Sequence, residues 1–113
     1  MPHFSNPSNP FGTHIQVWSG GWSPDEVRKA ADLAGEIGYQ FLEIPVRSPD
    51  TLKVNEIVRI LNERKMFCTT SFLHTPETDI GSDDKEVVKR GEQLMYDSLA
   101  IARDMGSHHL TGP

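Results

Sequence analysis

The sequence predicts an α/β protein whose strands lie parallel in one sheet, and two observations support that prediction. Short runs that favour extended backbone begin near His14, Phe41, Phe67 and His108. A longer amphipathic pattern with helical spacing separates each of these runs from the next. A strand–helix–strand repeat with short crossovers is typical of a parallel sheet covered by helices.

Length and composition limit the function classes. The chain has 113 residues, enough for one small domain, and its formal net charge of −5 argues against a broad nucleic-acid surface. It has no apolar run of about 18 residues and no basic segment ahead of an apolar one, so we expect neither a membrane span nor a secretory signal. The single cysteine, Cys68, excludes an internal disulfide. We therefore expect a cytoplasmic protein, with Cys68 as a small buried residue and not a nucleophile.

The N-terminal residues differ from the rest of the chain. Residues 1–12 carry Pro2, Pro7 and Pro10 among serines and asparagines, so we expect a flexible leader there and one structured domain over residues 13–113. The alternation of polar and apolar residues from His14 to Trp18 predicts the first strand. The glycine pair that follows indicates a tight turn and no phosphate-binding motif.

The first helix has clear start and stop signals. Ser23 is the expected N-cap, Pro24 suits the first helical position, and Glu26 is placed to complete a capping box. Gly38 is the expected left-handed stop. The apolar positions predicted to face the core are Val27, Ala30, Ala31, Ala34 and Ile37.

The run Phe41-Leu42-Glu43-Ile44-Pro45 predicts a short buried strand that carries one acid near its carboxyl end. Pro45 cannot donate a ladder hydrogen bond and should close the strand. In α/β proteins this end of a strand is where ligand-facing residues gather. Glu43 is therefore a candidate ligand contact; a salt bridge or cap to a neighbouring loop is the alternative.

The second half of the chain continues the repeat. A helix should begin at Ser48 or Asp50, and the apolar and β-branched residues of Met66–Phe72 predict the third strand. A long loop then precedes a helix from about Asp83 to Met105, in which Gly91 indicates close packing on a neighbouring element. The last expected strand is His108-His109-Leu110-Thr111. The second helix should bury Val54, Ile57, Val58 and Leu61, and the third Val87, Gly91, Leu94, Met95, Ser98, Ile101, Ala102 and Met105.

Two architectures fit this order of elements. A flavodoxin-like doubly wound sheet normally has five strands and could nearly be built from this length. A (β/α)8 barrel has eight strands and about 250 residues, of which the chain would hold four strands and three helices.

Several segments favour the barrel because they resemble one superfamily. They are Val17-Trp18-Ser19, the run from Ala34 through Tyr39 into Phe41-Leu42-Glu43-Ile44, the run Leu61–Met66, and Asp79–Asp84. Together they resemble the N-terminal half of the sugar isomerase/epimerase superfamily of xylose isomerase-like TIM barrels. The resemblance implies proton transfer on a sugar, sugar phosphate or polyol through an enediolate. It also implies a divalent ion (Mn²⁺, Mg²⁺ or Co²⁺) in full-length members.

The same resemblance implies which residues face the substrate. Trp18 would stack on a sugar face unless it is simply core, and Glu43 would bind sugar hydroxyls. His74 follows the third strand, where apurinic endonucleases place a zinc ligand; its surroundings depart from theirs, so we assign it to substrate binding. His108 and His109, adjacent on a strand, should face opposite ways and not share an ion.

The metal ligands of the epimerase-like members lie in the other half of their barrel. We therefore expect no metal site and no catalytic residue in this chain, and no activity from it alone. Two alternatives stay open: a non-enzymatic half-barrel that pairs with itself as a homodimer, and a repair protein like the apurinic endonucleases.

Overall fold

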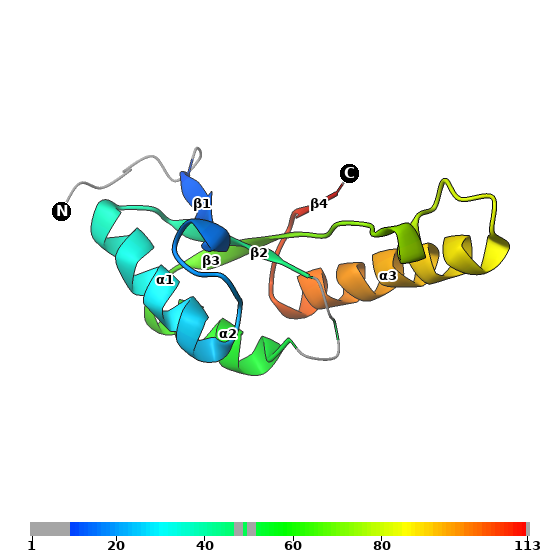
Figure 1. The fold of residues 1–113 in the computed structure, drawn as a ribbon. Coiled ribbons are helices and arrows are strands. Elements are labelled where there is room, and N and C mark those ends of the chain that lie inside the picture. Colours follow the sequence, from blue (N-terminus) through cyan, green and yellow to red (C-terminus); the bar gives the residue numbers. More distant parts are fainter. Residues whose placement is uncertain (1–9, 47–48, 50–51, 113) are drawn as a thin grey trace.

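Four parallel strands form one sheet in the order β1-β2-β3-β4 in the computed structural model, which describes residues 10–46, 49 and 52–112 (Figure 1). The strands are β1 (Gly12–His14), β2 (Phe41–Pro45), β3 (Phe67–Ser71) and β4 (Leu110–Thr111). Spatial order therefore equals chain order, as in a (β/α)8 barrel. A doubly wound sheet instead reverses its strand order at a switch point.

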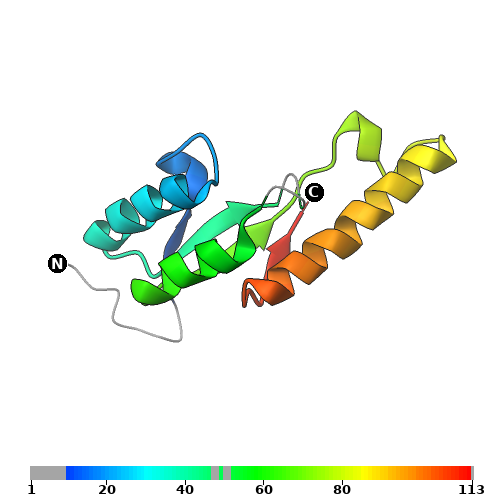
Figure 2. The ribbon, with the colours of Figure 1, turned by 90° about the horizontal axis from the view of Figure 1, so that it is seen from below.

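Three helices connect the strands: α1 (Pro24–Ile37), α2 (Val54–Glu63) and α3 (Lys85–Asp104). In Figure 2, α1 and α2 lie side by side against the sheet, while α3 begins beyond it and reaches it only with its last turns. One apolar core joins these helices to the sheet, and Leu42 and Ile44 of β2 lie at its centre with no exposed surface. Burying each such side chain contributes about 1.5–3 kcal/mol. The remaining core residues are Ile15, Val27, Ala30, Ala31, Ala34, Val46, Leu52, Ile57, Ile60, Leu61, Met66, Cys68, Ile101 and Met105.

The start of α1 confirms its expected N-cap but not its expected capping box. The Ser23 hydroxyl accepts from the backbone N–H of Glu26, and Gly38 ends the helix with a φ of 107°. The Glu26 carboxylate, however, accepts from the hydroxyls of Ser19 (2.7 Å) and Ser23 (3.0 Å). Glu26 thus fastens the turn that follows β1 to the first turn of α1. Ile37, expected in the core, is 43% exposed at the last position of the helix.

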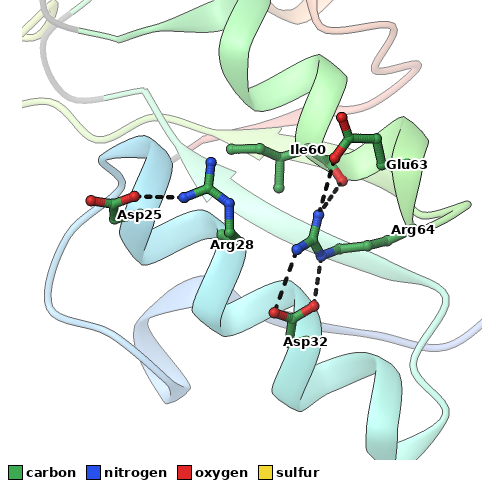
Figure 3. A network of polar contacts seen from close by, with 6 residues as sticks. All are labelled: Asp25, Arg28, Asp32, Ile60, Glu63 and Arg64. Carbon is green, nitrogen blue, oxygen red and sulfur yellow. Dashed lines mark hydrogen bonds and ion pairs between the residues drawn. The ribbon is translucent and has the colours of Figure 1, made fainter.

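A charged contact links α1 to α2 on their solvent side (Figure 3). Arg64 donates to both carboxylate oxygens of Asp32, from Nε at 2.6 Å and from Nη2 at 3.4 Å. Its Nη1 donates to the carbonyl oxygen of Ile60 at 3.0 Å. Arg64 therefore closes the end of α2 while it holds the side of α1. The expected starts of α2, Ser48 and Asp50, lie outside the described residues, and the helix begins at Val54.

The expected role of Gly91 in α3 is confirmed. A Cβ atom at Gly91 would lie 2.2 Å from the backbone oxygen of Thr78 and 2.7 Å from Cγ2 of Ile80. Thr78 ends a short 3-10 helix, η3 (Pro76–Thr78), in the loop after β3. The neighbouring Arg90 donates from Nε to the carbonyl oxygen of Glu77 at 3.0 Å. The loop after β3 is thus packed directly on α3.

The first strand lies earlier than the alternation of residues 14–18 predicts. β1 ends at His14, and Ile15–Val17 form a 3-10 turn, η1, whose N-cap is His14. Ile15 is fully buried and Val17 is 66% exposed, so only one of the two alternating apolar residues enters the core. Gly12 fits β1 because any side chain there would collide with the Phe41 ring. The expected leader over residues 1–12 falls mostly outside the described residues, and its last residue, Gly12, is the first of β1.

The last strand is shorter than the expected run from His108. β4 contains only Leu110 and Thr111, and both histidines precede it as exposed residues. The carbonyl oxygen of His109 accepts from the backbone N–H and the hydroxyl of Thr70. None of the helices in the described ranges is long and apolar enough to cross a membrane.

Candidate functional site

The two faces of the sheet differ in what covers them. Leu42 and Ile44 face the helices and are fully buried, whereas the alternate residues of β2 face the opposite side. No helix of the described ranges lies over that opposite side, which we call the open face (Figures 1 and 2). In a closed barrel this face lines the interior.

Three polar side chains form one row across the open face. The strand register pairs His14 of β1 with Glu43 of β2, and Glu43 with Thr69 of β3. Paired residues of parallel strands point to the same side of the sheet. Glu43 is the third of five residues of β2, so it lies within the strand and not at its carboxyl end as expected.

The row leaves hydrogen-bonding capacity unused. His14 Nε2 lies 3.9 Å from Glu43 Oε1, and the two side chains keep 30% and 33% of their exposure. That separation is longer than a direct hydrogen bond. The Thr69 hydroxyl is buried and has no hydrogen-bond partner among the described residues. We call His14, Glu43 and Thr69 the polar row.

An aromatic pair lies next to the polar row, toward the amino ends of the strands. Phe41 and Phe67 are register partners two residues before Glu43 and Thr69, and their rings stack with centroids 5.1 Å apart. Phe67 remains 46% exposed. The open face therefore has an apolar area toward the amino ends of the strands and polar side chains nearer their carboxyl ends.

Trp18 follows η1 at the carboxyl end of β1. Its ring is partly buried and packs against the core cluster, which agrees with the alternative that it is a core residue. Its indole nitrogen is buried and lacks a hydrogen-bond partner within the described ranges. Trp18 thus holds a polar N–H that nothing in this part of the chain satisfies.

His74 lies in the loop after β3. Its ring meets the ring of Phe72 edge-on at 5.3 Å, and its Nδ1 is buried without a partner among the described residues. It lines an open pocket of about 450 Å³ whose other residues are Leu73, Thr75, Pro76, Asp79 and Ile80. His74 therefore belongs to the loop that Gly91 and Arg90 hold against α3.

The predicted residues Trp18, Glu43 and His74 occupy three successive strand–loop units. Within the described part of the chain, no hydrogen bond, ion pair or ring contact joins any two of them. The structure instead brings His14 and Thr69 to Glu43, and sequence reasoning assigned neither residue to the site. Only the pairing register reveals them.

Burial raises the pKa of the Cys68 thiol to about 11, and its sulfur lies 3.6 Å from the carbonyl oxygen of Met105. Such a protonated, enclosed thiol is a poor nucleophile, as expected. The described residues contain no group of three histidine, cysteine, aspartate or glutamate side chains able to hold a metal ion.

Comparisons with known proteins point to sugar epimerases. No family model matches the chain. Its sequence is 30% identical, over 90% of its length, to an L-ribulose 3-epimerase from Methylomonas sp. (strain DH-1). It is 27% identical, over 89% of its length, to a ketose 3-epimerase from Arthrobacter globiformis. The chain spans 36% and 35% of these two curated relatives, about a third of their length.

The fold gives the same result. The chain superimposes on the crystal structure of a D-allulose 3-epimerase from Methylomonas sp. in complex with D-allulose, with a TM-score of 0.87. The match has 30% sequence identity and covers 91% of this chain and 36% of the epimerase. The order of strands, the helices on one face and these relatives agree: over about a third of their length, the chain is homologous to sugar 3-epimerases with the xylose isomerase-like TIM-barrel fold.

Proposed function

We propose that this chain forms the N-terminal part of the barrel of a ketose 3-epimerase and that the open face of its sheet contacts the substrate. We call this part of the barrel the substrate-facing wall. The reaction would move a proton at the carbon next to the ketose carbonyl through an enediolate. The divalent-metal requirement that the resemblance implies is part of the proposal, and we assign it no ligand among the described residues. Trp18, Glu43 and His74 are the proposed substrate contacts from this chain.

The polar row on the open face is the observation that carries this proposal. In a barrel, side chains on that face fill the interior and ligands bind at the carboxyl ends of the strands, where His14 ends β1. A carboxylate, an imidazole and a hydroxyl side by side can bind the hydroxyls of a sugar, which both donate and accept hydrogen bonds. The names of the relatives, all ketose or ribulose epimerases, favour a ketose as that ligand.

The same geometry leads us to propose that the chain alone does not epimerise a sugar. Inverting a carbon centre through a planar enediolate needs a proton donor and a proton acceptor on opposite faces of that plane. The only titratable groups in the row are His14 and Glu43, which are neighbours on one wall. An opposing group would have to come from a second wall.

Ketose binding and proton exchange test the two parts of the proposal separately. Binding of D-allulose to the full chain is measured by calorimetry, and loss of its C3 proton signal in D₂O is followed with and without Mg²⁺. We expect weak, saturable binding and no exchange at C3. If no binding is seen at high sugar concentration, the proposal that the open face contacts the substrate is refuted. If the C3 proton exchanges steadily, the proposal that the chain alone does not epimerise a sugar is refuted. Glu86→Gln, an exposed change on α3, is the matched control for changes at Glu43.

The sheet edges favour a second candidate, the self-pairing half-barrel. β1 pairs only with β2 and β4 only with β3 in the described part of the chain, so each leaves one edge unpaired. Two copies related by a two-fold axis would supply the eight strands of a barrel. Light scattering on the purified chain tests this candidate: a compact dimer supports it, and a folded monomer at high concentration contradicts it.

A further inference from the structure

The hydrogen bond at His14 fixes which nitrogen of its ring faces Glu43. His14 Nδ1 accepts the backbone N–H of Gln16 at 3.1 Å, an interaction that also caps η1. A neutral imidazole that accepts at Nδ1 carries its proton on Nε2. The ring therefore presents an N–H donor toward the carboxylate of Glu43, and the turn after β1 holds it in that orientation.

The space between His14 Nε2 and Glu43 Oε1 suits a single bridging hydroxyl group in both size and polarity. At 3.9 Å, Nε2 and Oε1 lie beyond hydrogen-bonding distance, yet both face the same open side. A hydroxyl can accept from Nε2–H and donate to the carboxylate at once, whereas an anion would be repelled by Glu43.

The third group extends the site along the sheet. The Thr69 hydroxyl is the register neighbour of Glu43 on β3, and it is buried without a partner among the described residues. A buried hydroxyl with no partner carries an energetic penalty that a ligand can relieve. The described strand residues that share this face include no lysine or arginine; they are Gly12, His14, Phe41, Glu43, Pro45, Phe67, Thr69, Ser71 and Thr111.

We propose that His14, Glu43 and Thr69 form a hydroxyl-binding subsite for an uncharged sugar, in which one hydroxyl bridges His14 and Glu43 and another meets Thr69. The subsite rests on the proposed function and extends it. It adds His14 and Thr69 to the proposed substrate contacts, and it selects a neutral sugar over a phosphorylated one. His14 acts as donor, Glu43 as acceptor, and Thr69 as either.

Two conservative variants and one direct signal test the subsite. Glu43→Gln keeps the size of the side chain and removes its charge, and Thr69→Val removes only the hydroxyl. We expect the dissociation constant for D-allulose to rise about 10- to 100-fold in Glu43→Gln and about 2- to 10-fold in Thr69→Val. Thr111→Val, on the same face of β4 and outside the polar row, should bind as the unmodified chain does.

The unmodified chain supplies a readout that does not depend on any variant folding. Adding D-allulose should shift the imidazole proton signals of His14 and leave those of the exposed His108 unchanged, and D-allulose 6-phosphate should bind more weakly than D-allulose. Equal unfolding midpoints for the variants and the unmodified chain would exclude a merely structural effect. If the chain binds no ketose, the proposed function fails; if it binds ketose but both variants bind normally and the His14 signals do not move, only the subsite is refuted.

Discussion

Replacing Gly91 by alanine tests how the loop that carries His74 is held in place. A Cβ atom there would lie 2.2 Å from the Thr78 carbonyl oxygen, so η3 must move by more than an ångström or α3 must shift. The alanine favours the helix by about 1 kcal/mol, but overpacking of this kind costs about 1–3 kcal/mol. We expect Gly91→Ala to lower the free energy of unfolding by up to about 2 kcal/mol.

Gly35 offers a matched control in another helix. A Cβ atom at Gly35 of α1 would have no heavy atom within 4 Å, so Gly35→Ala gains helix propensity without a collision. We expect that variant to be more stable than the unmodified chain by up to about 1 kcal/mol. The difference between the two alanine variants then isolates the contact of α3 with η3.

Urea unfolding followed by far-ultraviolet circular dichroism measures both changes on the same scale. The amide of Thr78, which donates to the Thr75 carbonyl at 2.9 Å, gives a local readout by hydrogen exchange. The exchange of the Thr78 amide should be faster in Gly91→Ala and unchanged in Gly35→Ala. Equal stabilisation by the two alanines, with Thr78 exchange unaffected, would refute the proposed packing of the loop on α3.

Three further changes follow from single contacts. Asp32→Asn should lower the free energy of unfolding by no more than about 1 kcal/mol, less in high salt, because the Asp32 side chain of this ion pair is 55% exposed; urea unfolding at two salt concentrations measures this. Ser23→Ala should cost about 1 kcal/mol, seen as a lower melting temperature, because it removes the N-cap of α1. The thiol pKa of Cys68 is raised from 9.0 to about 11, so the folded state keeps a proton that the unfolded state loses. Its stabilising effect is complete below pH 9 and is lost between about pH 9 and 11, by roughly 2–3 kcal/mol; Cys68→Ala should lack this slope in pH-dependent urea unfolding.

Each of these expectations has a contradicting outcome. A salt-independent loss of several kcal/mol in Asp32→Asn would mean that the pair with Arg64 is effectively buried. An unchanged melting temperature in Ser23→Ala would mean that the cap contributes nothing measurable. Identical alkaline slopes with and without Cys68 would mean that its thiol titrates alike in the folded and unfolded chain.

Local patterns predicted most of the fold because their causes are local. α1 begins at Pro24 and stops before Gly38 because of backbone preferences that no tertiary contact overrides. The alternation over His14–Trp18 misplaces the first strand, because it suits a strand as well as a 3-10 turn that buries only Ile15. The true position of β1 depends on Gly12 fitting against Phe41, a contact between residues far apart in the chain.

The candidate site was less predictable for the same reason. Glu43 could be identified because it interrupts an apolar strand. His14 and Thr69 gave no such signal, since only the parallel register brings them beside Glu43. Glu26 shows the same limit: its spacing from Ser23 is that of a capping box, but its carboxylate accepts from the hydroxyls of Ser19 and Ser23.

The most direct test of the substrate-facing wall is a map of nuclear Overhauser contacts between bound D-allulose and the isotope-labelled chain. We expect contacts from sugar protons to the side chains of the open face, with His14 and Thr69 among them. Contacts confined to the helix-covered side, or to the pocket beside His74 alone, would contradict the claim that the open face of this sheet meets the substrate.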